Sequence, residues 1–141
     1  MLVKEIMKTS KDVITCSAND YVVDAAKKME EHNIGCILVM ENGKLNGILT
    51  DRDIALAVVA RGKNSSEVKV SEIMKTQMIT GRPNWDLSDA TKLMAEKKIR
   101  RLPIQSNGRL EGFISLADIA PIFKKELDSF LDIEASPIKY W

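Results

Sequence analysis

Two short stretches of the sequence place a hydroxyl side chain three residues before a carboxylate. Thr50 precedes Asp53 in this way, and Ser115 precedes Asp118. A carboxylate can accept hydrogen bonds from both vicinal hydroxyls of a ribose, and a hydroxyl can donate to a phosphate oxygen. The same residue types are also the preferred N-caps of helices. The pattern therefore supports two interpretations, a nucleotide site or an ordinary helix start.

Two adjacent arginines, Arg100 and Arg101, stand just before a short apolar run. A guanidinium group can bind a phosphate through a bidentate fork of N–H donors. A solvated strand edge is the other interpretation of such a pair. These arginines are therefore candidate phosphate ligands.

Residue types for other chemistry are scarce. The sequence contains two cysteines, Cys16 and Cys36, and one histidine, His32, with no C-x-x-C spacing. These residues cannot complete a structural zinc site, and the cysteines are typical of small buried side chains in a reduced cytosol. Asp51 and Asp53 lie two residues apart on a predicted helix start, so they do not face each other. We therefore predict a non-catalytic protein with no metal and no resident cofactor.

The overall charge excludes other classes of function. The 141 residues include 21 basic and 20 acidic side chains, which gives a net charge of +1. A surface that tracks nucleic acid needs a clear basic excess, so we expect no such partner. No apolar run reaches the roughly 20 residues of a membrane-spanning helix. The amino terminus lacks the apolar core of a secretory signal, so we expect a cytoplasmic protein with no membrane partner.

The chain consists of two similar halves. A shift of 65 residues aligns Ile14-Thr15 with Ile79-Thr80 and aligns residues 53–55 with residues 118–120. The alignment needs no gap from residue 13 to residue 55 of the first half. Such a match indicates a duplication. We predict a first repeat at residues 1–66, a second at 67–128, and a C-terminal tail at 129–141.

Each half has the pattern of a β-α-β-β-α unit. A brief β-like stretch is followed by an amphipathic helix, in which Val22, Ala25 and Met29 share one face of the first copy. An apolar strand then turns back at Asn42-Gly43 or Asn107-Gly108, and Asn-Gly is a strong hairpin signal. A second helix closes each half. The predicted strands comprise residues 12–15, 36–40 and 44–50 in the first copy and residues 77–80, 102–104 and 109–115 in the second.

The closing helix of the first copy, residues 54–60, is apolar on all sides. Such a helix must be covered on both sides, by its own sheet and by the sister repeat or another chain. The second copy presents Ile119, Ile122 and Phe123 at the corresponding place. A two-fold dimer is the commonest way to bury such a surface, so we predict a homodimer.

The motifs resemble those of the cystathionine β-synthase (CBS) domain family. Residues 47–54 and 112–119 both read glycine, two apolar residues, Thr or Ser, two variable residues, Asp and an apolar residue. The resemblance spans roughly residues 3–125. It implies an α/β fold in which two pseudo-symmetric repeats pack through their sheets and form two clefts. It also implies a regulatory module that binds AMP, ADP, ATP or S-adenosylmethionine, dimerises into a disc of four repeats, and controls another protein that the sequence does not identify.

The resemblance assigns roles to particular residues. In the family, a basic residue at the place of Arg100 and Arg101 serves the phosphate of a nucleotide whose ribose is held by the opposite repeat. We therefore expect both arginines beside Thr50 and Asp53, and none in the cleft of Ser115 and Asp118. The implied nucleotide-binding residues are Ile14, Thr15, Thr50, Arg52, Asp53, Ile79, Thr80, Arg100, Arg101, Ser115 and Asp118. The alternative is a structural or interaction module that keeps the fold and binds no ligand.

Overall fold

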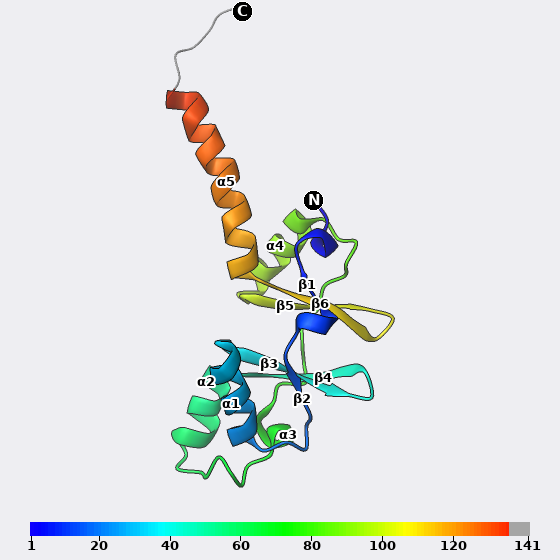
Figure 1. The fold of residues 1–141 in the computed structure, drawn as a ribbon, viewed down its shortest axis with the longest axis vertical. Coiled ribbons are helices and arrows are strands. Elements are labelled where there is room, and N and C mark those ends of the chain that lie inside the picture. Colours follow the sequence, from blue (N-terminus) through cyan, green and yellow to red (C-terminus); the bar gives the residue numbers. More distant parts are fainter. Residues whose placement is uncertain (136–141) are drawn as a thin grey trace, which may run out of the picture.

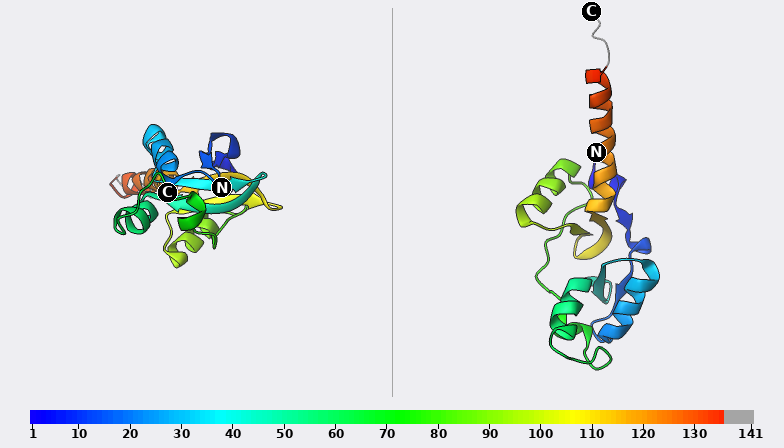
Figure 2. Two further views of the ribbon diagram at one scale, coloured as in Figure 1. Left: turned by 90° about the horizontal axis from the view of Figure 1, so that it is seen from below. Right: turned by 90° about the vertical axis from the view of Figure 1, so that its left-hand side faces the viewer.

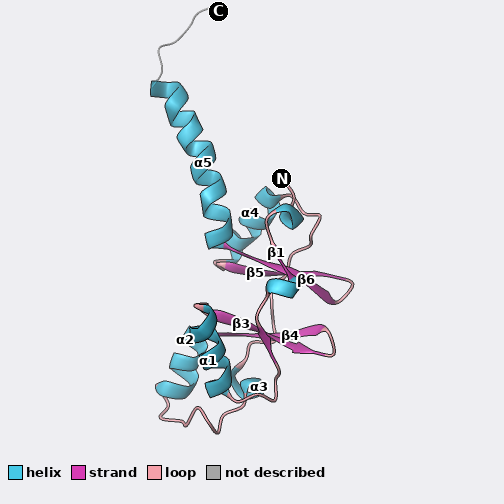
Figure 3. Cartoon of the chain, in the orientation of Figure 1, coloured by secondary structure: helices cyan, strands magenta, loops and turns pink. Residues whose placement is uncertain are grey.

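The computed structural model describes residues 1–135, which form two lobes stacked along the long axis (Figure 1). Each lobe is one repeat, with a β-hairpin toward the centre and helices on the outside (Figure 3). The first lobe contains β2 (Thr15–Cys16), α1 (Val22–His32), β3 (Cys36–Glu41), β4 (Lys44–Thr50), α2 (Asp51–Ile54) and the π-helical turn η3 (Ala55–Val59). The second contains α4 (Leu87–Lys97), β5 (Arg101–Ser106), β6 (Arg109–Ser115) and α5 (Leu116–Ala135). The head segments contain η1 (Val3–Glu5), β1 (Lys8–Thr9), η2 (Ser10–Asp12) and α3 (Val70–Ile73).

The predicted helix–hairpin–helix order is present in both repeats, but the opening strand differs between them. In the first repeat, Thr15 pairs in parallel with Leu38 of β3. In the second, residues 77–80 form no regular strand, and an isolated parallel bridge joins Gly81 to Ile104. The expectation of a strand at 77–80 is therefore wrong.

The two long amphipathic helices end alike. The apolar face of α1 is buried in the first lobe, and α1 ends at Asn33, which has a left-handed φ of 52°. Helix α4 ends at the matching Lys98, with a φ of 55°. Asparagine adopts this conformation at little cost, whereas lysine is strained in it.

The two hairpins join into one curled sheet. Both turns are the predicted Asn-Gly pairs, in which the asparagine φ is 52° and the glycine φ is 76°. Lys44 of β4 pairs with Arg109 of β6 and links the hairpins. The strand order is β1-β6-β4-β3-β2, with β5 on β6. A register shift in each hairpin, between Val39 and Met40 and between Ile104 and Gln105, moves the pairing by one residue.

The head of each repeat packs on the other repeat. Val3 is fully buried in the hydrophobic core of the second lobe, and β1 pairs antiparallel with β6. In return, Val70 is buried in the core of the first lobe, and Lys75 bridges Ile48 of β4. The two lobes therefore exchange their first segments, and neither core is complete without the other repeat.

Helix α5 extends well beyond the second lobe (Figures 1 and 2). It continues through Pro121, which cannot donate the usual backbone hydrogen bond, to Ala135. Residues 129–135 of the predicted tail are therefore helical, and residues 136–141 lie outside the described residues. None of the helices within residues 1–135 combines the length and hydropathy needed to cross a bilayer.

Candidate ligand clefts between the repeats

The Thr50–Asp53 pair forms a reciprocal helix cap where β4 meets α2. The Asp53 backbone N–H donates to Thr50 Oγ1 at 3.1 Å, and the Thr50 N–H donates to Asp53 Oδ2 at 3.0 Å. Lys75 Nζ, from the head of the second repeat, lies 3.2 Å from Asp53 Oδ1, and the Asp53 side chain is only 11% exposed. The carboxylate is therefore occupied on both oxygens, and a ribose would have to displace Lys75 to reach it.

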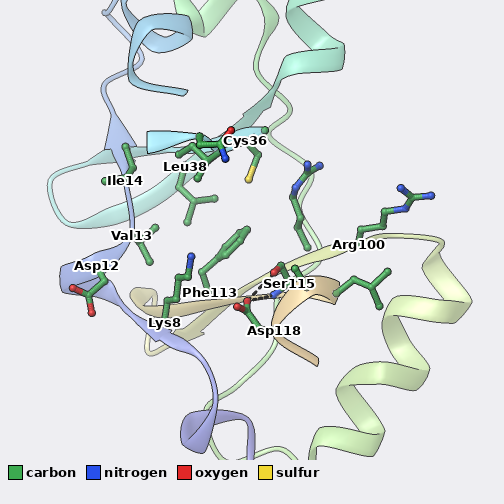
Figure 4. A pocket seen from close by; sticks show the side chains of 16 residues that line it. Lys8, Asp12, Val13, Ile14, Cys36, Leu38, Arg100, Phe113, Ser115 and Asp118 are labelled. Atoms are coloured by element: carbon green, nitrogen blue, oxygen red, sulfur yellow. Dashed lines mark hydrogen bonds between the residues drawn. The ribbon is translucent and has the colours of Figure 1, made fainter. Parts of the chain in front are cut away.

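The Ser115–Asp118 pair forms only the half of this arrangement in which the carboxylate accepts. The Ser115 N–H and Oγ–H donate to Asp118 Oδ2 at 2.8 Å and 2.7 Å (Figure 4). The ion pairs found among residues 1–135 include no partner for Asp118. The interpretation as a helix cap is thus confirmed for Thr50, whereas the Ser115 hydroxyl donates to Asp118 instead of accepting from the helix. Asp118 keeps one carboxylate oxygen available for a ligand.

The Thr50 cleft, as we call it, is a cavity of about 390 Å³ between the repeats. Thr50 and Arg52 contribute from the first repeat, and Ile79, Arg100 and Arg101 from the second. The cleft thus brings together five of the residues implied by the resemblance. The further cationic residues that line it are Lys75 and Lys98.

Two residues that were expected in the Thr50 cleft do not line it. Asp53 sits behind Thr50 and Lys75. Thr80 instead accepts a hydrogen bond from Gln105 Nε2 at 3.0 Å, beside a different cavity. Access to Asp53 therefore depends on movement of Lys75.

The Ser115 cleft is a cavity of about 400 Å³ on the other side of the interface. Ser115 and Asp118 face it from the second repeat, and Lys8, Asp12 and Ile14 from the first (Figure 4). Thr15 is not part of its lining. The Thr15 carbonyl instead accepts a hydrogen bond from Lys28 Nζ at 3.0 Å. The two clefts are thus related by the same pseudo-symmetry as the sequence.

The expectation that the Ser115 cleft lacks arginines is wrong, because Arg100 and Arg101 line both cavities. The hairpin register places Arg101 directly opposite Ser115. The Leu116 N–H also donates to the Arg100 carbonyl at 2.8 Å. Figure 4 shows the Arg100 side chain extending away from Ser115 and Asp118.

Arg101 occupies the boundary between the clefts because Gly35 leaves room for it. A Cβ atom on Gly35 would lie 2.8 Å from Arg101 Nη2 and 3.0 Å from Asp51 Oδ2. The missing side chain of Gly35 is therefore what admits the guanidinium group.

The two clefts differ in their balance of charge. The Thr50 cleft has five cationic side chains against the single carboxylate of Asp51. The Ser115 cleft has three cationic side chains against two carboxylates. Lys8 of the Ser115 cleft is the counterpart of Lys75, so Arg52 and Lys98, which align with Ala117 and Asn33, make the difference. Sequence reasoning missed Lys75 and Lys98 as residues of the cleft. Lys98 aligns with the uncharged Asn33, and this difference in the sequence could have revealed the difference in charge between the clefts.

Both cysteines are buried free thiols. Burial raises the pKa of Cys36, and the adjacent Arg101 opposes that rise. Burial, assisted by Asp20, raises the pKa of Cys16 to about 11. Neither thiol is therefore suited to act as a nucleophile near neutral pH.

The raised pKa of Cys16 predicts a loss of stability in alkali. The folded pKa exceeds the unfolded value, so the folded protein holds this proton more tightly. The contribution is fully present below the unfolded pKa and is lost as the pH rises toward 11. We expect urea unfolding between about pH 8 and about pH 10.5 to show a loss of the order of 2 kcal/mol from this group. The Cys16→Ala variant should lose correspondingly less stability over the same pH range. Equal losses in the wild type and the variant would show that Cys16 is not the group responsible.

Comparison with known proteins places this architecture in a family. The model of the CBS domain matches residues 3–60 and 70–124, so the chain belongs to the CBS-domain family and carries two copies. It is 47% identical over 118 residues to the CBS domain-containing protein YhcV of Bacillus subtilis, which covers 84% of this chain and 82% of that protein.

Solved structures agree with this assignment. The CBS domain pair of protein MJ0100, in complex with 5′-methylthioadenosine and S-adenosyl-L-methionine, superposes with a TM-score of 0.78 at 31% identity. The match covers 89% of this chain and 98% of that one. The hexameric CBS-CP12 protein of bloom-forming cyanobacteria superposes with a TM-score of 0.73 at 31% identity, over 85% of this chain and 69% of that one. CBS pairs are ligand-binding regulatory modules rather than catalytic ones.

Proposed function

We propose that this protein is a regulatory module that binds an adenosine-containing ligand in the clefts between its repeats. The observation that carries this proposal is the Thr50 cleft, which combines a strand-end hydroxyl, a nearby carboxylate and five cationic side chains drawn from both repeats. A ligand that touches both repeats stabilises one arrangement of them, which is how binding can be signalled. The adenosyl ligands of the MJ0100 pair support the choice of ligand class.

The charge of the Thr50 cleft favours a phosphorylated nucleotide. Phosphates would be bound by Arg100, Arg101 and Lys98, because charge-assisted contacts from these groups are strong. The ribose would reach Asp53 when a phosphate draws Lys75 away from it. S-adenosylmethionine carries a sulfonium cation, which five positive side chains repel. We therefore assign AMP, ADP or ATP to the Thr50 cleft, and a less anionic adenosyl compound to the Ser115 cleft.

Calorimetric titration with ATP and with adenosine tests this proposal. Replacing Arg100 and Arg101 by alanine should weaken ATP binding by at least about tenfold, because two charge-assisted contacts are lost. Adenosine has no phosphate, so its affinity should change much less. An equal loss for both ligands would show that the arginines do not bind phosphate. The absence of heat with any adenosyl ligand would favour a structural module that binds nothing.

A matched pair of variants distinguishes the two clefts. Lys98→Asn gives the second repeat the residue that the first repeat has at Asn33, and asparagine fits the left-handed backbone there. It should weaken ATP binding in the Thr50 cleft by roughly threefold to tenfold, since an exposed charge contributes modestly. Asn33→Lys adds a cation to the Ser115 cleft and should not weaken the binding of ATP there. The opposite result would reverse the assignment of the nucleotide.

We also propose a homodimer that forms through helix α5. Leu116, Phe123 and Phe130 alternate with Ala120 and Leu127 at steps of four and three residues, which is the spacing of a helix–helix seam. Phe123, Leu127 and Phe130 are 47%, 58% and 67% exposed. An exposed apolar stripe along a helix marks a protein–protein interface, and a second copy of the chain supplies a matching stripe. The hexameric assembly of the CBS-CP12 protein supports self-association.

The closing turn of the first repeat has exposed apolar side chains of its own. Val58 is only 1% exposed and packs inside its own lobe, whereas Leu56 and Val59 are 52% and 72% exposed. The helix at 54–60 is therefore covered on one side by its own repeat, and Val58 is not an interface residue.

Two free thiols fit a reducing compartment, so we propose that the dimer acts in the cytoplasm, on a partner that the fold does not identify.

A further inference from the structure

A third cavity lies at the turn end of the second lobe, away from both clefts. Its volume is about 730 Å³, and it is bounded by the loop at residues 80–85, the β5–β6 turn and the N-terminal segment at Lys4. It shares no lining residue with the Thr50 cleft or the Ser115 cleft. Whatever it binds is therefore separate from the ligand proposed above.

Backbone hydrogen bonds between distant segments fix the walls of this cavity. The Lys4 N–H donates to the Pro83 carbonyl at 2.9 Å, and the Gln105 N–H donates to the Gly81 carbonyl at 3.0 Å. Gln105 Nε2 donates to Thr80 Oγ1 at 3.0 Å, which orients that amide across the floor. The shape of the cavity is thus set by the fold.

The cavity lining carries positive charge and a planar aromatic group. Lys4 and Arg82 stand on adjacent backbone, no ion pair of either is found in the described part of the chain, and no carboxylate lines the cavity. The amides of Asn84 and Gln105 add hydrogen-bond donors. Trp85 lines the same cavity while it packs, half-buried, against the core of the second lobe. The arrangement suits an anion that also carries a flat ring.

The first repeat lacks this chemistry at the matching positions. A shift of 65 residues aligns Trp85 with Asp20 and Ser106 with Glu41, so two acidic residues stand where the second repeat has none. Arg82 aligns with Ser17, whose N–H donates to Asp20 Oδ2 at 3.0 Å. The charge reversal is thus confined to the repeat that has the cavity, and it is not a consequence of the duplicated fold.

We propose that this cavity, which we call the Trp85 site, binds a small organic anion composed of an aromatic ring with a phosphate or carboxylate group. The cations of Lys4 and Arg82 hold the anionic group, and the ring lies against the indole. The protein then has two separate kinds of ligand site, one between the repeats and one at the end of the second repeat.

The test uses phenyl phosphate as the probe, with inorganic phosphate and phenol as its separate halves. Trp85 and Trp141 are the two tryptophans of the sequence, so Trp141→Phe leaves a single indole N–H signal for NMR titration. Phenyl phosphate should shift that signal saturably and bind at least about tenfold more tightly than phosphate or phenol, because both contacts are needed. No saturable shift, or equal affinity for the three probes, would overturn the proposal.

A matched substitution and a competition experiment complete the test. Arg82→Ser gives the second repeat the serine that the first repeat has at the matching position. This change should weaken the binding of phenyl phosphate by about tenfold. Arg61→Ser removes an arginine that lines none of the three cavities and should leave the affinity unchanged. Saturating ATP should not displace the probe. Displacement of phenyl phosphate by ATP would place the probe in a cleft and refute a separate site. This result would leave the proposed binding of nucleotide in the clefts standing.

Discussion

Replacing Leu127 and Phe130 with aspartate is expected to convert the protein from a dimer into a monomer of 15.8 kDa. Both side chains lie on the exposed stripe of α5, and each aspartate would have to be buried in the seam without a partner. A buried unpaired charge is strongly destabilising, so the two together should raise the dissociation constant by several orders of magnitude. Light scattering coupled to size exclusion at micromolar protein measures the change in mass.

The matched control places two aspartates on the outer face of the helix. Lys125→Asp combined with Ser129→Asp alters exposed positions of α5 away from the stripe. This variant should remain dimeric, and circular dichroism should show unchanged helix in both proteins. A wild-type mass near 15.8 kDa, or dissociation of the control, would refute the proposed seam.

Gly112→Ala should be the most destabilising single-methyl change in the described lobes. The added Cβ would fall against the Lys8 backbone carbonyl, only 2.3 Å from its oxygen. That carbonyl belongs to β1, which pairs with β6 and anchors the exchanged head, so it cannot move without breaking the pairing. Overpacking of this kind costs about 3 kcal/mol. Urea unfolding measures the loss.

Gly47 is the equivalent residue of the first repeat and provides the comparison. A Cβ there would lie 3.0 Å from the Lys75 carbonyl oxygen and 2.8 Å from the sulfur of Met74, whose side chain can move aside. Gly47→Ala should therefore cost about 1 kcal/mol. Equal losses would show that the closer approach of the Lys8 carbonyl does not make Gly112 the more sensitive of the two positions.

The sequence was sufficient for features that depend on local chemistry. The Asn-Gly turns have the left-handed backbone that the hairpin signal requires. The periodic face of Val22, Ala25 and Met29 is buried, as a helical spacing predicts. The duplication also predicted correctly that a helix, a β-hairpin and a second helix follow one another twice, although the opening strand is regular only in the first repeat.

Features that depend on register or on distant partners were not predictable. The register shift at Ile104 and Gln105 places Arg101 opposite Ser115, whereas an unbroken hairpin would place it opposite Ile114 on the other face. Periodicity likewise identified Val58 as apolar but could not say which segment covers it. The ion pair of Asp53 with Lys75 joins residues from different repeats, and no local pattern encodes it.

The exchange of head segments also determines when the protein can fold during its synthesis. The first lobe lacks Val68 and Val70 of its core until the start of the second repeat has left the ribosome. The second lobe needs Val3, which is made before the rest of that core and must stay unburied until Leu87, Leu102 and Ile114 follow. The core of the first lobe can therefore close only after the start of the second repeat has been made, and the core of the second lobe closes last.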